Sequence, residues 1–414
     1  MVANPTLQPR SRRQFLGALG AVALGGLAAC SKSGSADRSR ARSSASDEVI
    51  PTARPQVSMR PPTSVRDVTS FGAVGDGSTD DTAAIQRAID SMDAGSAVRF
   101  PAGMTFCHDD VLVVRTAGTQ LLGPGTLRAT REHRSALQIR AADVTVDGLV
   151  LSIEKTSQRW STPAQHKLML AAYDGIVVKN VRVEGSAAAG VFCLGTSNFV
   201  LQGLQVSDTR ADGIHMTDGC HDGLVEAPMV TRSGDDAVAV VSYLDDAKRC
   251  EKITILSPRV RTTTGGRGLS VVGGHNVIYR DIDVADSFAA AVYVACEGGP
   301  SVTYPSEGVR VIGGTITGAN TDSAIDHGAV LVYSGRSGGA VRDVIVSGLT
   351  ISGTRATASR QVGAVADNHD ALSEITFEQL RLDRHPQAYQ GNAPLSALSV
   401  VGVVAGGDPV QAPR

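Results

Sequence analysis

The 414-residue chain is poor in aromatic residues and in lysine. Aromatic side chains make up 4% of the residues, Trp160 is the one tryptophan, and six lysines stand against 33 arginines. A binding surface built on aromatic stacking is therefore poorly supplied, and Trp160 is its main candidate. The shortage of lysine reflects genome composition and carries little information about chemistry.

The cysteines do not indicate a disulfide scaffold. Without Cys30, which lies in a leader segment, five remain at positions 107, 193, 220, 250 and 296, an odd number. Cys193 occupies an apolar position of a strand pattern, which predicts a core residue. A loop-bridging disulfide between Cys220 and Cys250 stays open as an alternative.

An apolar run from Leu16 is too short and too rich in glycine and alanine for a good transmembrane span. Before it, residues 11–16 read Ser-Arg-Arg-Gln-Phe-Leu, which matches the twin-arginine export signal. After it, Leu-Ala-Ala-Cys at 27–30 resembles a bacterial lipobox. We expect residues 1–29 to be a signal peptide. Cys30 would then carry the lipid that holds the protein on the outer face of the cytoplasmic membrane, within the cell envelope. A plain cleaved signal is the alternative.

Residues 30–62 are rich in Ser, Arg, Ala and Pro and show no apolar periodicity, which is typical of a flexible tether. Residues 1–29 carry +3 and residues 30–60 carry +3, so the net charge of −2 leaves −8 on the rest. A domain this acidic is not expected to bind nucleic acid, and a strongly anionic substrate is disfavoured.

A short cassette recurs in the middle of the chain, with a small residue followed by apolar, variable and apolar positions. The small residues stand at 190, 213, 237, 268 and 291, so the steps are 23, 24, 31 and 23 residues. A period in the twenties with strand alternation is the signature of a parallel β-helix. Related patterns from Asp143 to Ile375 indicate about ten coils. The β-helix is expected over residues 63–388, with a C-terminal cap and tail over 389–414.

The domain opens with a glycine-rich turn and a short helix. We predict a helix from Thr82 to about Ser91, capped by Asp80 or Asp81, because a solenoid must cover the open edges of its first coil. Capping and turn formation explain the acidic residues here better than a metal site.

This opening, GAVGDGSTDDTAAIQRAID and then FPAG, closely resembles the N-terminal signature of the pectate-lyase-like superfamily. The resemblance implies an all-β, single-stranded, right-handed parallel β-helix with an N-terminal capping helix. It does not fix the reaction, since the superfamily includes hydrolases, lyases, epimerases and phage tailspikes.

The cassettes place several polar residues in columns, because equivalent positions on successive coils lie about 4.8 Å apart. Asp212, Asp236 and Arg267 form one column at the strand entrances, and Asp235 lies beside it. Three carboxylates on one solvent face repel each other and gain nothing from packing, which favours a functional cluster over an acidic turn ladder. The next outward column is predicted to hold Phe192, His215, Ala239, Ser270 and Tyr293.

This segment also resembles glycoside hydrolase family 28, the polygalacturonase-like enzymes. The family pattern is N-T-D-G, G-D-D, G-H-G and R-I-K, and here residues 210–213 read Arg-Ala-Asp-Gly and 234–236 read Gly-Asp-Asp. The resemblance implies Asp235 as general acid, with Asp212 and Asp236 holding the nucleophilic water. Residues 266–268 read Gly-Arg-Gly and 293–295 read Tyr-Val-Ala, so the bases that recognise a uronate carboxylate are missing.

We therefore predict an inverting glycosidase that uses three aspartates, requires no metal or other cofactor, and acts on a polysaccharide other than galacturonan. Arg267, His215 and Tyr293 are the candidate substrate-binding residues, and we expect a monomer. One alternative is a polysaccharide lyase with Ca²⁺ on the three aspartates and Arg267 as base or clamp. Another is a non-catalytic glycan-binding surface protein.

Overall fold

The computed structural model describes residues 53, 55–57, 60–246, 248–367 and 371–410. The predicted signal peptide, Cys30 and most of the tether lie outside these residues. Across the described residues, no helix is long and apolar enough to cross a membrane.

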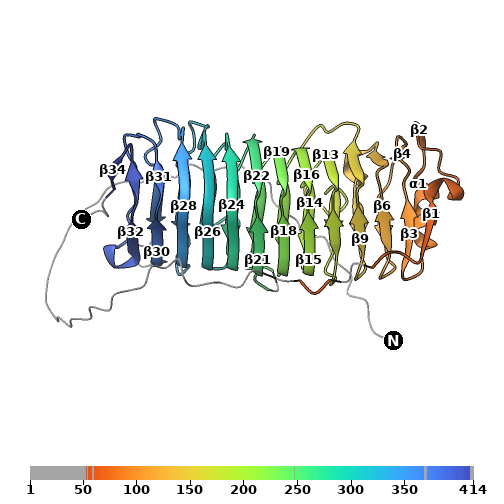
Figure 1. The fold of residues 1–414 in the computed structure, drawn as a ribbon, viewed down its shortest axis with the longest axis horizontal. Coiled ribbons are helices and arrows are strands. Elements are labelled where there is room, and N and C mark those ends of the chain that lie inside the picture. The colour runs from red at the N-terminus through yellow and green to blue at the C-terminus, as the bar shows by residue number, and fades with distance from the viewer. Residues whose placement is uncertain (1–52, 54, 58–59, 247, 368–370, 411–414) are drawn as a thin grey trace. The chain divides into compact units, whose positions relative to one another are not determined.

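The described chain forms two parallel sheets that wind into a right-handed β-helix, as the sequence predicts. In Figure 1 the strands of successive coils lie side by side. One sheet takes one strand from each of ten coils and has the order β29-β27-β25-β23-β20-β17-β14-β11-β8-β5. Its strands are β5 (Leu112–Val114), β8 (Leu137–Ile139), β11 (Leu168–Leu170), β14 (Val191–Leu194), β17 (Ile214–Thr217), β20 (Val238–Val241), β23 (Leu269–Val272), β25 (Val292–Cys296), β27 (Val330–Ser334) and β29 (Val362–Ala366).

The second sheet has 24 strands and forms the remaining walls of the coils. Its strands are β1 (Ser64–Asp67), β2 (Asp76–Asp80), β3 (Ser96–Arg99), β4 (Thr105–His108), β6 (Gln120–Leu122), β7 (Thr126–Ala129), β9 (Thr145–Asp147), β10 (Val150–Ile153), β12 (Val177–Lys179), β13 (Arg182–Ser186), β15 (Ser197–Gln202), β16 (Gln205–Thr209), β18 (His221–Glu226), β19 (Met229–Ser233), β21 (Glu251–Leu256), β22 (Arg259–Thr263), β24 (His275–Ala285), β26 (Ser306–Thr317), β28 (Val341–Ser352), β30 (Leu372–Glu378), β31 (Arg381–Leu382), β32 (Leu398–Val401), β33 (Val404–Ala405) and β34 (Asp408–Pro409). Short 3₁₀ turns lie at Val68–Phe71, Glu132–Arg134 and Leu395–Ala397.

The core lies inside the coils and consists of stacked aliphatic side chains. Ile214, Val238 and Leu269 are directly paired on successive coils and are fully buried. Each inward position therefore packs on its equivalent above and below, which is how a repeat without a self-sufficient core becomes stable.

Helix α1 (Thr82–Asp90) covers the first coils, and Figure 1 shows it beside β1 at that end of the stack. Its buried residues are those of the predicted apolar face, Ala84, Ile85, Ala88 and Ile89.

The acidic residues before α1 serve the turn. The Asp81 carboxylate does not cap the helix but accepts hydrogen bonds from the backbone N–H groups of Val74 and Gly75, at 2.7 and 2.9 Å. Asp80 instead accepts from the backbone N–H of Thr82 at 3.0 Å. These contacts agree with capping and turn formation as the role of these residues, with Asp80 at the start of the helix and Asp81 in the turn before it.

The solenoid continues past residue 388, where the sequence predicts a cap and tail. Strand β32 pairs in parallel with β30, and β33 pairs with β31. The antiparallel strand β34 then lies on β33 and ends the sheet.

The five described cysteines are all free and buried, so the alternative disulfide between Cys220 and Cys250 is not formed. Each thiol finds a neighbour in the core: Cys220 Sγ lies 3.4 Å from the carbonyl oxygen of Cys193, and Cys250 Sγ lies 3.5 Å from that of Val241. Cys193 is a core residue, as its strand position predicts.

Candidate active site

The predicted column at the strand entrances is present. Asp212 precedes β17, Asp235 and Asp236 precede β20, and Arg267 precedes β23. Gly213 N–H donates to the Asp236 carbonyl at 3.0 Å, and Ala237 N–H donates to the Arg267 carbonyl at 2.9 Å. The inter-coil backbone ladder thus stacks the three turns in register.

The three aspartates converge. One carboxylate oxygen from each of Asp212, Asp235 and Asp236 lies within 4.8 Å of the other two. This is the one such cluster of three or more potential ligands that the described residues contain. At this distance their negative charges interact strongly, so their protonation states are linked.

Asp212 is the carboxylate that is most readily ionised. Its Oδ2 lies 2.9 Å from Nδ1 of His215, the outward residue of β17. Burial alone would raise the pKa of Asp212, but His215 and Arg159 outweigh that effect and hold the pKa below its ordinary value. His215 Nε2 is buried and makes no hydrogen bond.

Asp236 is the carboxylate that holds its proton most strongly. Its side chain is 6% exposed. Its Oδ1 accepts from the backbone N–H of Arg267 at 2.7 Å, and its Oδ2 accepts from the Ser270 hydroxyl at 2.6 Å. Burial is the largest effect and, with Asp235 and Asp212 nearby, raises the pKa of Asp236 to about 7 despite the Arg267 charge.

Asp235 is the carboxylate that faces solvent, with 29% of its side chain exposed. Arg159 Nη1 lies 2.7 Å from Asp235 Oδ2. Burial and the charge of Asp212 still raise the pKa of Asp235, against the opposing effect of Arg159. Arg159 is not among the site residues predicted from the sequence; it lies in the connection between β10 and β11.

Gly266 lets the next coil pass close over this cluster. Its φ is +64°, and a Cβ atom there would lie 2.4 Å from Asp235 Oδ1 and 2.5 Å from the backbone nitrogen of Asp236. The position therefore requires glycine both for its backbone conformation and for the space that the carboxylate occupies.

Arg267 and Tyr293, predicted to bind substrate, are held by a residue that the prediction missed. Glu297 Oε1 lies 2.8 Å from Arg267 Nη2 and accepts from the Tyr293 hydroxyl at 3.0 Å. Tyr293 is 3% exposed. Arg267 lies over its ring, 4.2 Å from the centroid, and His327 stacks on it at 5.3 Å. Tyr293 therefore offers no open ring face for stacking on a sugar.

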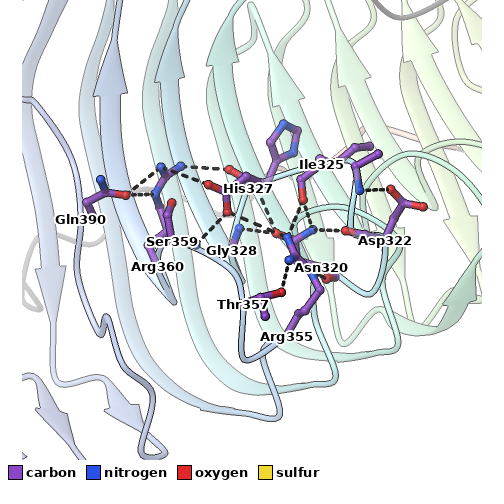
Figure 2. Close-up of polar contacts among 12 residues, drawn as sticks. Asn320, Asp322, Ile325, His327, Gly328, Arg355, Thr357, Ser359, Arg360 and Gln390 are labelled. Atoms are coloured by element: carbon purple, nitrogen blue, oxygen red, sulfur yellow. Dashed lines mark hydrogen bonds and ion pairs between the residues drawn. The ribbon is translucent and has the colours of Figure 1, made fainter. Parts of the chain in front are cut away.

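His327 reaches this position from the connection before β27. Asn320 Oδ1 accepts from the backbone N–H groups of His327 and Gly328, at 2.9 and 2.8 Å, and Arg360 Nη1 donates to the Asp326 carbonyl at 3.1 Å. Figure 2 shows this network below the His327 ring, which extends away from it. Burial, followed by Arg267 and Arg360, lowers the pKa of His327 to about 3, so the imidazole is neutral.

A second row of stacked rings lies in the coils of β11, β14 and β17, at and before the coil of Asp212. Phe192 stacks between His166 and His215, with centroid distances of 3.9 and 5.2 Å. Trp160 lies elsewhere: its backbone N–H donates to Ala187 O at 2.8 Å, and its ring is 6.4 Å from that of His133. These contacts anchor the loop that carries Trp160.

Several solved structures share this fold. The catalytic domain of a glycoside hydrolase family 87 α-1,3-glucanase in complex with nigerose matches 86% of this chain and 67% of its own, with a TM-score of 0.60 and 13% identity. A hyperthermoactive exopolygalacturonase from Thermotoga maritima matches 86% and 94%, with a TM-score of 0.56 and 14% identity. PfbA, a surface adhesin of Streptococcus pneumoniae, matches 82% and 89%, with a TM-score of 0.59 and 13% identity.

At these identities the likeness shows the fold and leaves the activity open. No curated protein matches the sequence. A family does: the one described as rhamnogalacturonase A/epimerase, pectate lyase-like, matches residues 65–294, more than half of the chain. That span contains the three aspartates and Arg267. The chain therefore belongs to the rhamnogalacturonase A/epimerase family of pectate-lyase-like proteins.

Proposed function

We propose that this protein is a glycoside hydrolase that cleaves a polysaccharide, with Asp235 as general acid and Asp212 and Asp236 as holders of the attacking water. The observation that carries the proposal is the convergence of three carboxylates within 4.8 Å, with the pKa of Asp212 lowered and the pKa values of Asp235 and Asp236 raised. One cluster thus supplies an ionised base, Asp212, and an acid, Asp235, whose burial favours the protonated form.

Exposure supports the division of roles. Asp235 is the most exposed of the three, so its carboxyl is the one that can reach a glycosidic oxygen. Asp236 is engaged on both oxygens and is better suited to orient a water than to donate its proton to substrate. Asp212, ionised beside His215, is the natural acceptor of the proton that the water loses.

The spacing also suits a single bound water. A water that forms hydrogen bonds of about 2.8 Å can bridge oxygens up to roughly 5.6 Å apart, so the 4.8 Å cluster can hold one. Inversion stays our prediction, although these oxygens lie closer than the roughly 6.5–9.5 Å between carboxyl groups that is usual for inverting enzymes. Proton NMR of the first-formed product anomer decides the point, and a retained anomer would contradict inversion.

A calcium-dependent lyase is the second candidate, because three carboxylate oxygens within 4.8 Å of one another could hold one metal ion. The surroundings fit a cation poorly. Arg159 is already bound to Asp235, and Arg267 lies 3.7 Å from Asp236 Oδ1, so a divalent ion would meet two guanidinium groups. A non-catalytic glycan-binding protein is the third candidate, since a surface adhesin shares the fold.

Product analysis on a panel of neutral and acidic polysaccharides separates the three. Wild type and Asp235→Asn are compared with and without a calcium chelator. New reducing ends that fall by about 10²–10⁴-fold in the variant and ignore the chelator support the hydrolase. Ultraviolet-absorbing products that vanish with the chelator would establish the lyase instead. Glycan binding without any product would favour the binding protein.

We also propose that the protein works as a monomer, exported by the twin-arginine pathway and anchored through a lipid on Cys30. The leader motifs support the export and the lipid anchor, and the tether composition supports the anchor.

A further inference from the structure

The charges next to the aspartates suggest which sugars the site accepts. Two guanidinium groups lie there, and each is already paired with a carboxylate. Arg159 binds Asp235 at 2.7 Å, and Arg267 binds Glu297 at 2.8 Å. Each guanidinium charge is therefore already met by a carboxylate before a substrate arrives.

Glu297 is held in place by its own connection. Thr303 Oγ1 accepts from the Glu297 backbone N–H at 2.8 Å, and the Thr303 backbone N–H donates back to Glu297 O at 3.1 Å. Arg336 then fastens this loop by donating to the Thr303 carbonyl at 3.0 Å. The carboxylate therefore keeps its position against Arg267 at little further entropic cost.

The pair also remains accessible. Arg267 is 23% exposed and Glu297 is 25% exposed, so a sugar beside the aspartates would meet both. A uronate approaching Arg267 would have to displace Glu297 or lie next to it, and either costs electrostatic energy. Glu297 lies three residues beyond the segment that the family matches, so the family match does not assign it.

Resting on the proposed glycosidase function, we propose that Glu297 is a specificity-determining residue that occupies Arg267 and restricts this subsite to sugars without negative charge. The substrate class that follows is a glycan whose residue at this subsite carries no carboxylate or sulfate. Arg267 there donates hydrogen bonds to sugar hydroxyls. Because Glu297 balances its charge, Arg267 does not act as a binding site for an anion.

The test measures binding and leaves bond cleavage out. Trigalacturonate and its methyl ester share one skeleton and differ in charge, and their dissociation constants are measured by calorimetry in an Asp235→Asn background. We expect the ester to bind more tightly than the acid. Glu297→Gln should shift the ester-to-acid affinity ratio by about tenfold toward the acid, because Arg267 becomes available to a carboxylate. Adding Arg267→Met should abolish that gain.

Glu307→Gln is the matched control, because Glu307 lies in β26 of the other sheet, is 26% exposed and pairs with Arg249 and Arg342. An unchanged ratio in Glu297→Gln, an equal change in Glu307→Gln, or no binding of the acid by Glu297→Gln would overturn the proposal. Glu297→Ser serves as a second charge-removing variant should glutamine disturb folding. Product analysis tests the glycosidase function, and the affinity ratio tests the role of Glu297. Either measurement can give a negative result while the other is positive, so failure of one proposal can be told from failure of the other.

Discussion

At the scale of single residues, the site depends on side chains that repeat and on others that do not. Asp212, Asp236 and Arg267 could be placed from the sequence because each lies at the same point of a cassette, and backbone pairing then fixes their stacking. Glu297 and Arg159 could not, because they lie in connections that follow no repeat. The length of a connection does not indicate which of its side chains turns toward the site.

Gly266 provides a test of how tightly the site is packed. Gly266→Ala should lower kcat at least tenfold and destabilise the fold by about 1–2 kcal/mol, because the new Cβ displaces the Asp235 carboxylate. Gly338→Ala is the control: its φ of +68° is similar, and a Cβ there meets nothing within 4 Å. Steady-state kinetics and thermal unfolding measure both effects. Equal kcat losses in the two variants would show that backbone strain alone is responsible.

Asp236 links the chemistry to stability. The folded state keeps the proton of Asp236 up to about pH 7, whereas the ordinary pKa is 3.8. Between these values the folded chain binds more protons than the unfolded chain, so this group's contribution to stability falls as pH rises and is lost above about pH 7. Asp236→Asn should therefore raise the free energy of unfolding at pH 8 by about 1–3 kcal/mol and give little gain at pH 4. Urea titrations at both pH values measure this, and a pH-independent difference would contradict it.

At the scale of elements, strand β11 begins beside a buried lysine. Lys167 is 1% exposed, and its Nζ lies 3.5 Å from His108 Nε2 and donates to Ser135 O at 3.1 Å. Burial lowers the pKa of Lys167 from 10.5 to about 7. Lys167 lies in the bend that leads into β11, and its neighbour Leu168 also packs in the core, so the bend and not the strand alternation puts this amine inside.

Lys167→Met should stabilise the fold. Between pH 7 and 10.5 the unfolded state holds the lysine proton and the folded state does not, so wild-type stability rises with pH across that range. The variant should gain about 1–3 kcal/mol at pH 7, and the gain should shrink as pH approaches 10. Lys252→Met, at a side chain that is 56% exposed, is the control. A loss of stability in Lys167→Met would mean that the bond to Ser135 outweighs the buried charge.

The ends of the solenoid show where sequence patterns lose information. Helix α1 was predictable because its apolar spacing differs from the strand alternation around it. The last coil was not predictable, because proline and glycine interrupt the pattern after residue 388. Strand β32 nevertheless pairs with β30. An edge strand can pair through its backbone when its side chains carry little periodic signal.

At the scale of the whole molecule, the leader predicts an anchored enzyme. Cys30→Ser should move the protein from the membrane fraction to the soluble fraction, because the thiol is the expected lipid attachment site. Detergent phase partition and metabolic labelling with a fatty acid measure this. A variant that still partitions with membranes and incorporates label would contradict the assignment.

The direction of the ladder hydrogen bonds has a mechanical consequence. They link each coil to the next along the stack, so tension between the two ends of the solenoid would pull directly against them. A terminal coil has one neighbour and would peel first, releasing roughly 80 Å of extended chain for each 23-residue coil. A protein tethered at its N-terminus and holding a polymer would yield in steps that begin outside the coils carrying the aspartates.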